Sequence, residues 1–404
     1  MKKIAILFLC LSLVICTVIP ASASSIPIEP TSAEFDEPLP LNEQASAEIG
    51  ENLQINAKSA ILMEYNTGKV LYESNADLRL APASITKIMT LILVMEAIEG
   101  GRLSLDDKIT ASDHAASMGG SQIWLEPGEV MTVNDLLKAT VIASANDATV
   151  ALAEAVSGSE EVFLKLMNEK ADALGMESTH FVNSYGLDDD EHLTTAYDVA
   201  LMSRELLKHE LIREYSTIRI DSLRNGESEL TNTNKLIRYY DGCFGLKTGT
   251  TSKAGSCLAA TAERDNLTLI AVVLGSPTSK DRFTGCQKLL DFGFANYSYI
   301  NIEPDKADLH SIPVKKGTET EIIPEIIEKF SYLVKKGEEE KITSTLSLSE
   351  ELTAPVKKGD AVGSLNFYLN GEEIGRVKVT AKNGSNRLTY GVCLMRLLKS
   401  LFTL

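Results

Sequence analysis

The chain has 404 residues and a formal net charge of -17 at pH 7, from 39 Lys and Arg against 56 Asp and Glu. Such an acidic balance argues against a protein whose surface attracts nucleic acid. The length is sufficient for two domains, and the 44% hydrophobic content is sufficient for a full core in at least one of them.

The first segments of the chain are expected to lie outside the fold. A basic start, the apolar run 4–19 and a small-residue cleavage site after Ala23 predict a secretory signal peptide over 1–23. A lipoprotein site at Cys16 is less favoured, because a bulky isoleucine precedes that cysteine. Residues 24–55 are rich in Pro, Ser, Ala and acids, which predicts a flexible acidic lead.

Globular patterning begins near residue 57, and residues 60–72 read as a β-hairpin around Asn66-Thr67-Gly68-Lys69. Apolar periodicity then predicts helices at 85–98, 133–143, 147–156, 160–174, 195–209 and 281–294. Strand-like runs lie at 245–250, 257–262 and 267–274. Strands at both ends of this region predict one sheet assembled from both ends, with helices between them, in an α+β domain over 56–298.

The remaining sequence predicts a second, smaller domain. Residues 299–385 show short alternating strands broken by Lys-Lys-Gly turns, which favours a small β-sandwich. The tail 386–404 is apolar on most faces but carries Arg396 and Lys399, so it fits an amphipathic helix in a membrane interface. The alternative is a terminal helix packed on its own domain.

Ser84 and Lys87 open the first long predicted helix, one turn apart on the same face. A serine becomes a good nucleophile only when a base takes its proton, and a lysine can do so only if burial or nearby positive charge lowers its pKa. Taken alone, this spacing is common, and a helix cap beside a solvated lysine is the simpler interpretation.

A second polar cluster, Ser144-Ala145-Asn146, interrupts two apolar helical segments. Its place after a buried-looking run suggests that a hydroxyl and an amide are presented inside the protein, although an ordinary capped helix junction is an equal alternative.

The third cluster is Lys247-Thr248-Gly249-Thr250, on a predicted strand. The lysine and the threonines offer charge and hydroxyl donors to an anion, and Gly249 is expected to let a substrate backbone approach the strand. A glycine-containing edge strand with a solvated lysine is the alternative.

The three clusters occur in the order S-x-x-K, S-x-N, K-T-G that marks penicillin-binding proteins and serine β-lactamases. The chain resembles the low-molecular-mass penicillin-binding D-alanyl-D-alanine carboxypeptidases over roughly residues 55 to 380. A further stretch that is similar to a family signature is Asn232-Thr233-Asn234-Lys235-Leu236. The resemblance implies a penicillin-binding/β-lactamase-like domain, in which helices flank an antiparallel sheet and form a helical subdomain, followed by the small β-domain. It also implies that the tail is similar to the family's membrane anchor.

The resemblance also implies a catalytic cycle. Ser84 would attack the carbonyl between two D-alanines with Lys87 as base, releasing the terminal D-alanine and leaving an acyl-enzyme. Ser144 would pass the proton to the leaving amine, and Asn146 would hold the substrate amide. The N–H groups of Ser84 and Thr250 would form the oxyanion hole.

The substrate carboxylate would be gripped by Lys247, Thr248 and Thr250, with Arg282 matching a family arginine implicated in the same recognition. A surface arginine near a helix terminus is the alternative for Arg282. Two positions depart from the family: Thr250 stands where some relatives carry histidine, and the stretch 183–187 has serine where the family often has proline. We expect the second departure to soften a loop without touching a proposed catalytic group.

The expected partners are peptidoglycan stem peptides, β-lactam antibiotics as covalent inhibitors and a membrane surface at the tail, with the enzyme exported to the outer face of the cytoplasmic membrane or the cell wall. No cofactor or metal is expected, since the five histidines form no H-E-x-x-H or paired helical ligand motif. Four cysteines lie beyond the signal peptide and show no disulfide framework, so we expect buried apolar thiols; they are Cys243, Cys257, Cys286 and Cys393.

Three other functions compete with the carboxypeptidase. A serine β-lactamase shares the three motifs, but no E-x-x-L-N stretch supplies a deacylating glutamate. A D,D-endopeptidase would use the same acyl-enzyme on cross-links. An inert wall-binding scaffold would keep the fold and lose turnover, against which the intact motifs weigh.

Overall fold

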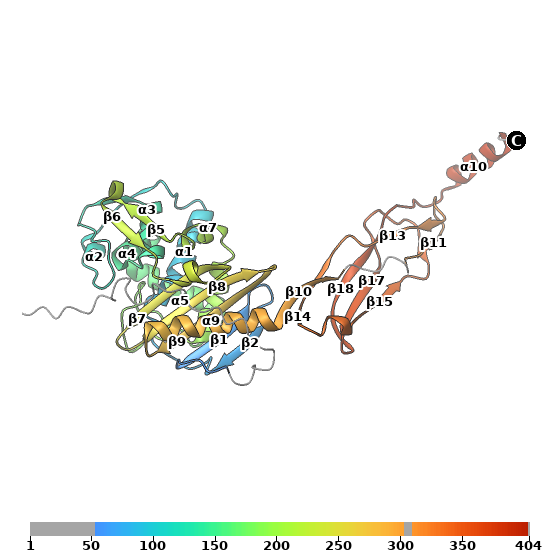
Figure 1. Cartoon of the computed structure of the whole chain (residues 1–404). Helices are drawn as coiled ribbons and strands as arrows, with labels where there is room; N and C mark the ends of the chain where they lie inside the picture. The colour runs from blue at the N-terminus through green and yellow to red at the C-terminus, as the bar shows by residue number, and fades with distance from the viewer. Residues whose placement is uncertain (1–52, 303–308, 403–404) are drawn as a thin grey trace, which may run out of the picture. The chain divides into compact units, whose positions relative to one another are not determined.

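The computed structural model describes residues 53–302 and 309–402 (Figure 1). The predicted signal peptide and nearly all of the predicted lead lie outside these residues. The globular part opens with a β-hairpin, as the sequence predicted: β1 (Ser59–Glu64) pairs antiparallel with β2 (Val70–Ser74).

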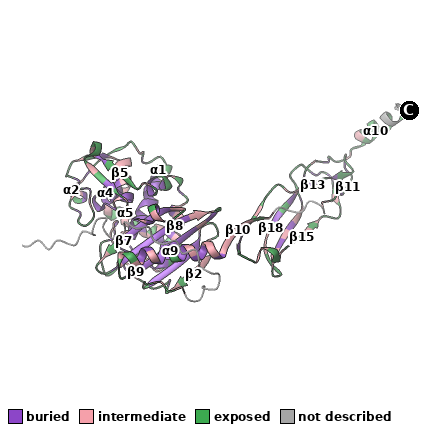
Figure 2. Ribbon diagram, in the orientation of Figure 1, coloured by how far each residue is buried: buried purple, intermediate pink, exposed green. Residues whose placement is uncertain are grey.

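A five-stranded antiparallel sheet forms the centre of the first domain. Its remaining strands are β7 (Cys243–Thr251), β8 (Gly255–Arg264) and β9 (Leu267–Ser276), and the order is β2-β1-β9-β8-β7. The sheet therefore joins the two ends of the domain, which confirms the prediction. β9 is buried along nearly its whole length, consistent with its almost continuous apolar sequence (Figure 2). β7, which carries the third motif, lies at one edge of the sheet, and β2 lies at the other.

The main helices lie between β2 and β7 in the sequence, and one more follows β9. The main ones are α1 (Lys87–Glu99), α3 (Val133–Ile142), α4 (Asn146–Ser157), α5 (Glu160–Ala173), α6 (Ala196–Leu206), α7 (Glu210–Ser216) and α9 (Ser279–Asn296). Four of them begin at a serine or threonine whose hydroxyl accepts a first-turn N–H; these caps are Thr132, Ser159, Thr195 and Thr278. The α+β fold class is confirmed.

The predicted helix 195–209 is wrong in its extent, because α6 ends at Leu206 and a separate helix begins at Glu210. His209 has extended backbone angles, which interrupt the helix. Several short elements were not predicted: β3 (Lys108–Thr110), α2 (Asp113–Ala116), β4 (Val130–Thr132), β5 (Ile220–Leu223), β6 (Ser228–Thr231) and α8 (Leu236–Tyr239).

The C-terminal part is built of β-structure, as expected. Two strands, β10 (Tyr297–Ile302) and β14 (Phe330–Lys335), form an antiparallel pair. A separate three-stranded sheet has the order β12 (Glu321–Ile322), β11 (Ile312–Lys315) and β16 (Leu352–Thr353). A four-stranded sheet contains β13 (Pro324–Glu325), β18 (Glu372–Ala381), β17 (Ala361–Leu369) and β15 (Ile342–Leu348).

Apolar side chains from both of these sheets share one small core, as in a sandwich; they include Ile312, Ile322, Val362 and Val379. Asn370 and Gly371 have φ values of 52° and 87° and form the tight turn between β17 and β18. Such a turn needs positive φ at both positions, which Asn-Gly provides at low cost.

The tail forms helix α10 (Tyr390–Phe402). Leu394, Met395 and Leu401 are exposed on it, and the Arg396 guanidinium donates to the Thr318 carbonyl. Within the described residues, no helix has both the length and the apolar character required to cross a bilayer.

The four cysteines in the described residues are free thiols. Cys257 and Cys286 are buried, as expected, and burial raises the pKa of the Cys257 thiol to about 11. The expectation is wrong for Cys393, which is exposed because it lies on α10, and Cys243 is only half-buried.

Candidate active site

Ser84 lies in a short 3₁₀ turn, η1 (Ala83–Thr86), that leads directly into α1. The preceding Ala83 has a φ of 49°, in the left-handed region that a residue with a Cβ adopts at a cost. Backbone strain of this kind persists only where surrounding structure imposes it. The Ala83 carbonyl fits against Gly186, where a Cβ would come within 1.9 Å of the carbonyl oxygen. The absence of a side chain at residue 186 therefore makes room for the turn that presents Ser84.

Lys87 follows on the first turn of α1, and its amine lies 3.0 Å from the Ser84 hydroxyl oxygen. Two further oxygens surround the same amine: Asn146 Oδ1 at 2.6 Å and the Tyr185 carbonyl oxygen at 2.7 Å. The Lys87 side chain is fully buried, so the alternative of a solvated lysine is wrong.

The electrostatic surroundings of Lys87 favour its neutral form. Burial lowers its pKa well below the usual value, the positive charge of Lys247 lowers it further, and Asp147 opposes the shift. A neutral amine has two N–H groups and one lone pair. The Asn146 and Tyr185 oxygens can only accept, so they take both N–H groups and leave the lone pair facing the Ser84 hydroxyl.

The second motif lies between α3 and α4, and it is buried, as the sequence suggested. Asn146 begins α4, and its Nδ2 donates to the Gly119 carbonyl at 2.6 Å, which fixes the orientation of the amide and aims Oδ1 at Lys87. Ser144 has a φ of 63°. Among the described residues, no hydrogen bond joins its hydroxyl to Ser84 or Lys87. The structure thus brings Asn146 into direct contact with Lys87, and places Ser144 two residues before it.

The loop 119–125, whose Gly119 and Ser121 carbonyls accept from Asn146, is held by Asp147, a residue to which the sequence analysis gave no role. Its buried carboxylate accepts the N–H groups of Ile123 and Leu125 at 3.0–3.2 Å. In the same loop, the Ser121 carbonyl accepts the Asn146 N–H, with 2.7 Å between nitrogen and oxygen. Both ends of this segment are therefore tied to the start of α4.

The third motif occupies edge strand β7, packed against the Ser84 turn. Lys247 is buried, which rules out a solvated lysine, and its amine donates to the Thr248 carbonyl at 3.1 Å. The Thr248 hydroxyl donates to Thr233 Oγ1 at 2.8 Å.

Packing against the Ser84 turn gives a second reason for glycine at position 249. A Cβ there would lie 2.9 Å from the Ser84 nitrogen and 3.1 Å from the Ile85 nitrogen. The bare backbone at Gly249 therefore leaves room for the Ser84 turn.

Arg282 lies on the first turn of α9 and is almost fully buried, so the alternative of a surface arginine is wrong. One of its guanidinium nitrogens donates to the Gly249 carbonyl at 3.0 Å and to the Thr250 hydroxyl at 2.7 Å. The other nitrogen donates to Ser279 Oγ at 3.2 Å. These contacts place positive charge directly behind the end of the β7 motif.

The stretch 183–187 reaches the site through the Tyr185 carbonyl, which accepts from Lys87, while Ser184, the residue that departs from the family, hydrogen-bonds to Thr90 and Glu160. Glu160 holds this stretch: its Oε1 accepts the Ser184 N–H at 2.9 Å and the Ser184 hydroxyl at 2.6 Å. The Ser184 carbonyl in turn accepts from the Thr90 hydroxyl at 2.6 Å. No sequence motif could have predicted the contact between Lys87 and Tyr185, since Tyr185 contributes a backbone carbonyl.

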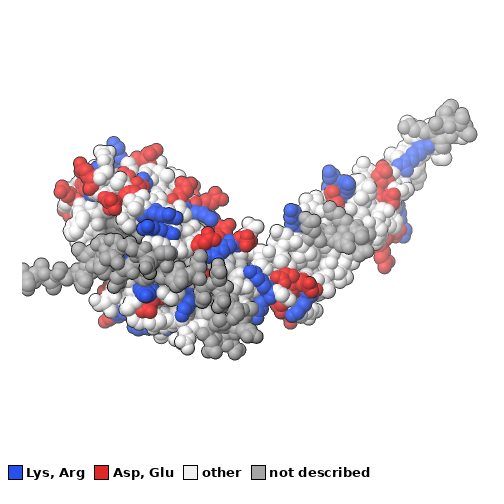
Figure 3. Space-filling view, in the orientation of Figure 1, with Lys and Arg blue, Asp and Glu red and all other residues white. Residues whose placement is uncertain are grey.

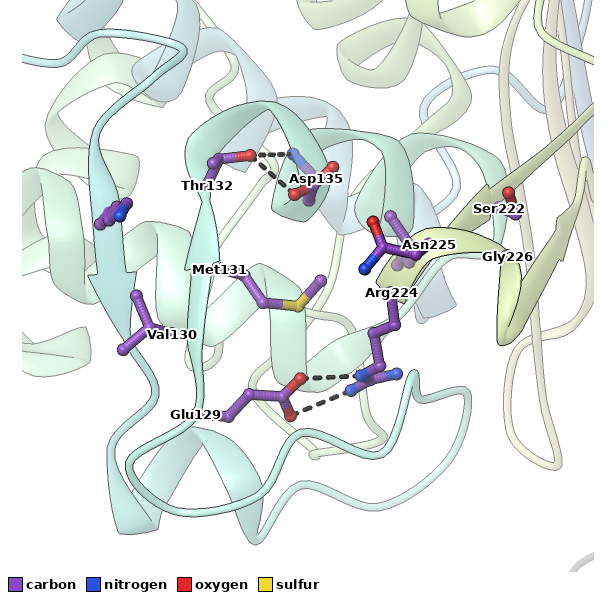
Figure 4. A pocket seen from close by; sticks show the side chains of 11 residues that line it. Glu129, Val130, Met131, Thr132, Asp135, Ser222, Arg224, Asn225 and Gly226 are labelled. Atoms are coloured by element: carbon purple, nitrogen blue, oxygen red, sulfur yellow. Dashed lines mark hydrogen bonds and ion pairs between the residues drawn. The ribbon is translucent and has the colours of Figure 1, made fainter.

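A separate hollow of about 640 Å³ lies between β4, α3 and the β5–β6 hairpin (Figure 4). None of the predicted site residues line it. Two pairs of its lining residues are bonded to each other: Arg224 donates two hydrogen bonds to Glu129, and Thr132 and Asp135 exchange hydrogen bonds. Arg224 also donates to the Ile123 carbonyl at 2.9 Å, so its side chain joins the lining of this hollow to the loop 119–125.

Comparisons with known proteins agree with this geometry. The model of the D-alanyl-D-alanine carboxypeptidase family matches residues 43–278, more than half of the chain. The chain belongs to this family of serine peptidases. The model of the C-terminal domain of penicillin-binding protein 5 matches residues 297–387. The resemblance inferred from the three motifs is confirmed, as are the enzyme class and the role in peptidoglycan metabolism.

Relatives of this family resemble the chain over most of its length. D-alanyl-D-alanine carboxypeptidase DacF of Bacillus subtilis (strain 168) is 44% identical over 84% of this chain and 88% of its own length. The crystal structure of penicillin-binding protein 5 from Haemophilus influenzae is 30% identical, with a TM-score of 0.68, over 83% of this chain and 98% of that one. Penicillin-binding protein D2 of Listeria monocytogenes, solved in an ampicillin-bound form, is 35% identical, with a TM-score of 0.56, over 60% of this chain and 99% of that one.

Proposed function

We propose that the chain removes the terminal D-alanine from peptidoglycan stem peptides through an acyl-enzyme on Ser84. The observation that carries this proposal is the buried Lys87 amine, 3.0 Å from the Ser84 hydroxyl, with its pKa lowered and its two N–H groups matched to fixed acceptors. Such an amine can accept the hydroxyl proton as the oxygen attacks the carbonyl.

The remaining motif residues have supporting roles in the proposal. Attack forms a bond between Ser84 Oγ and the penultimate D-alanine carbonyl, and expulsion of the terminal D-alanine breaks the amide bond. Ser144 passes the proton to the leaving amine. The substrate carboxylate is held by Lys247, Thr248 and Thr250, with Gly249 bringing β7 close to Ser84. Arg282 adds positive charge from behind β7. Water then releases the shortened peptide.

Labelling with a fluorescent penicillin tests the nucleophile. The wild type should acquire a covalent label, and Ser84→Ala should not. Incubation with a pentapeptide that ends in D-Ala-D-Ala should release free D-alanine, followed by mass spectrometry. Retained labelling of Ser84→Ala would contradict the proposal.

Two further measurements separate the competing activities. Slow release of the bound penicillin fits the carboxypeptidase, whereas rapid turnover would favour a β-lactamase. Cleavage of cross-linked dimeric peptides at a rate comparable to that of the pentapeptide would favour a D,D-endopeptidase. A chain that binds penicillin covalently but releases no D-alanine from any peptide would be an inert scaffold.

We also propose that the chain is exported after cleavage behind Ala23 and that 386–404 adsorbs to a membrane surface. The support is the exposed apolar side chains of α10 together with Arg396, a cation on the same helix. Acidic and basic side chains are interspersed over the visible face of the described residues (Figure 3). Vesicle sedimentation tests the tail: the full chain should pellet with vesicles, and a chain ending at residue 385 should not.

A further inference from the structure

A buried histidine beside the Ser84 turn has no part in the proposed chemistry. His192 is 1% exposed, and its ring packs edge-on against Phe181 at 5.8 Å between centroids. Its Nε2 lies 2.7 Å from the Thr86 hydroxyl oxygen, and its Nδ1 lies 3.0 Å from the Val182 nitrogen. The ring therefore bridges the stretch 180–194 and the last residue of η1.

The hydrogen bonds at both ends of the ring assign one tautomer. The Val182 backbone N–H can only donate, so Nδ1 must carry a lone pair. At the other end, the single Thr86 hydroxyl proton is given to the Ala83 carbonyl, 2.9 Å away. Nε2 must therefore donate to the Thr86 oxygen. The result is a directional chain from Val182 through His192 and Thr86 to the Ala83 carbonyl.

The carbonyl at the end of this chain shares its peptide group with the Ser84 N–H. A trans peptide is planar and points its C=O and N–H in opposite directions, so a bond that fixes one fixes the other. The Ser84 nitrogen faces β7, because a Cβ on Gly249 would lie 2.9 Å from it. Hydrogen bonds in series also polarise one another, which makes the N–H at the far end a better donor.

We propose that Thr86 and His192 are positioning residues that orient and polarise the Ser84 amide N–H as a donor to the oxyanion formed during acylation. This inference rests on the proposed function, since it requires an acyl transfer at Ser84. Neither residue touches the substrate, and both act through the Ala83–Ser84 peptide group.

Several charged or titratable groups surround the ring without disturbing this assignment. Asp188, Asp189 and His180 are the groups whose charges act on His192. Burial dominates and lowers the pKa of His192 to about 4, which keeps the ring neutral at neutral pH. A cationic ring would place a proton on Nδ1, opposite the Val182 N–H.

Paired variants of the full chain test the proposal. Thr86→Val and His192→Leu remove the donor chain, whereas Thr86→Ser keeps the hydroxyl and His192→Gln supplies one acceptor and one donor in place of the ring nitrogens. Loss of a whole oxyanion donor lowers kcat by about 10²–10³-fold, so loss of its orientation should cost about 10- to 100-fold. KM for the pentapeptide should change less than about twofold, because the oxyanion exists only in the transition state. The matched variants Thr86→Ser and His192→Gln should recover most of kcat.

The infrared carbonyl-stretching band of the penicillin acyl-enzyme reports directly on the hydrogen bond from the Ser84 N–H to the acyl oxygen. In Thr86→Val the band should move to higher wavenumber, because the acyl oxygen has lost part of its donor. An unshifted band together with wild-type kcat would overturn the inference, and so would a loss that appears only in KM or that Thr86→Ser does not recover. If Ser84→Ala still labels with penicillin, the proposed function itself fails. A failure of the positioning role alone leaves Ser84→Ala unlabelled.

Discussion

Gly249→Ala tests whether β7 and the Ser84 turn pack as tightly as the structure indicates. The new methyl would lie 2.9 Å from the Ser84 nitrogen, 3.0 Å from Ala83 Cβ and 3.1 Å from the Ile85 nitrogen. Ordinary contacts begin near 3.4 Å, so the turn and the strand must separate by about 0.5 Å. Backbone atoms supply two of these contacts and cannot rotate away.

The magnitude follows from this displacement. Overpacking of a well-packed site costs about 1–3 kcal/mol, so the free energy of unfolding should fall by that amount. A misplacement of about 1 Å can slow an enzyme by about 10²-fold, so about 0.5 Å should slow acylation by roughly 10-fold. Ser84 should move away from Thr250, and the loss should appear in the acylation rate constant.

The assay is single-turnover acylation by a fluorescent penicillin, combined with denaturant unfolding. Gly391→Ala is a suitable control, because its methyl would find nothing closer than 4.0 Å. If residue 249 instead served substrate approach, Gly249→Ala would raise KM and leave stability unchanged. That result, or acylation within about twofold of wild type, would refute the packing argument.

Three further predictions concern charges around the site. Lys247→Met should move the acidic limb of the acylation pH profile to higher pH, since removal of a neighbouring cation raises the pKa of Lys87; an unmoved limb would contradict the coupling. Glu160→Leu should lower the free energy of unfolding by about 1–3 kcal/mol, measured by denaturant titration, because the Ser184 N–H and hydroxyl lose their acceptor, while Glu160→Gln should keep more of it. His192 should make the protein less stable as the pH falls from about 6.5 to about 4, by about 3 kcal/mol in total, because in this window the unfolded chain binds a proton that the native ring does not. This loss of stability should be absent in His192→Gln. If the free energy of unfolding of His192→Gln falls with pH as much as that of the wild type, His192 is not its cause.

The sequence predicted the large elements well, because each has a strong local signal. The apolar runs of β8 and β9 and the periodicity of α1 are long, so the sheet and its helices could be foreseen. β3 and β4 have only three residues each and form through pairing with one another, which leaves no periodic pattern in the sequence. His209 is another such case, since its extended backbone is a local conformational choice within an otherwise helical pattern.

At the site, the sequence allowed the side chains of the motifs to be proposed, but it did not reveal the contacts that backbone atoms make. Ser84, Lys87 and Asn146 could be proposed because their side chains carry the motif, and the structure brings them into contact. The Tyr185 carbonyl has no signature, since every residue has one. The lack of a side chain at Gly249 was noted, but its packing against the Ser84 turn was not predicted, because a sequence does not show which chain segment faces a missing side chain.

The distribution of thiols has a practical consequence. Of the cysteines that the structure describes, Cys393 is the exposed one, while Cys257 and Cys286 are enclosed and Cys243 is half-buried with a pKa raised to about 12 by burial. Maleimides react with accessible thiolates, so a brief exposure near neutral pH should modify Cys393 first. The protein thereby offers a natural attachment point for a polarity-sensitive dye on α10, without any engineered cysteine.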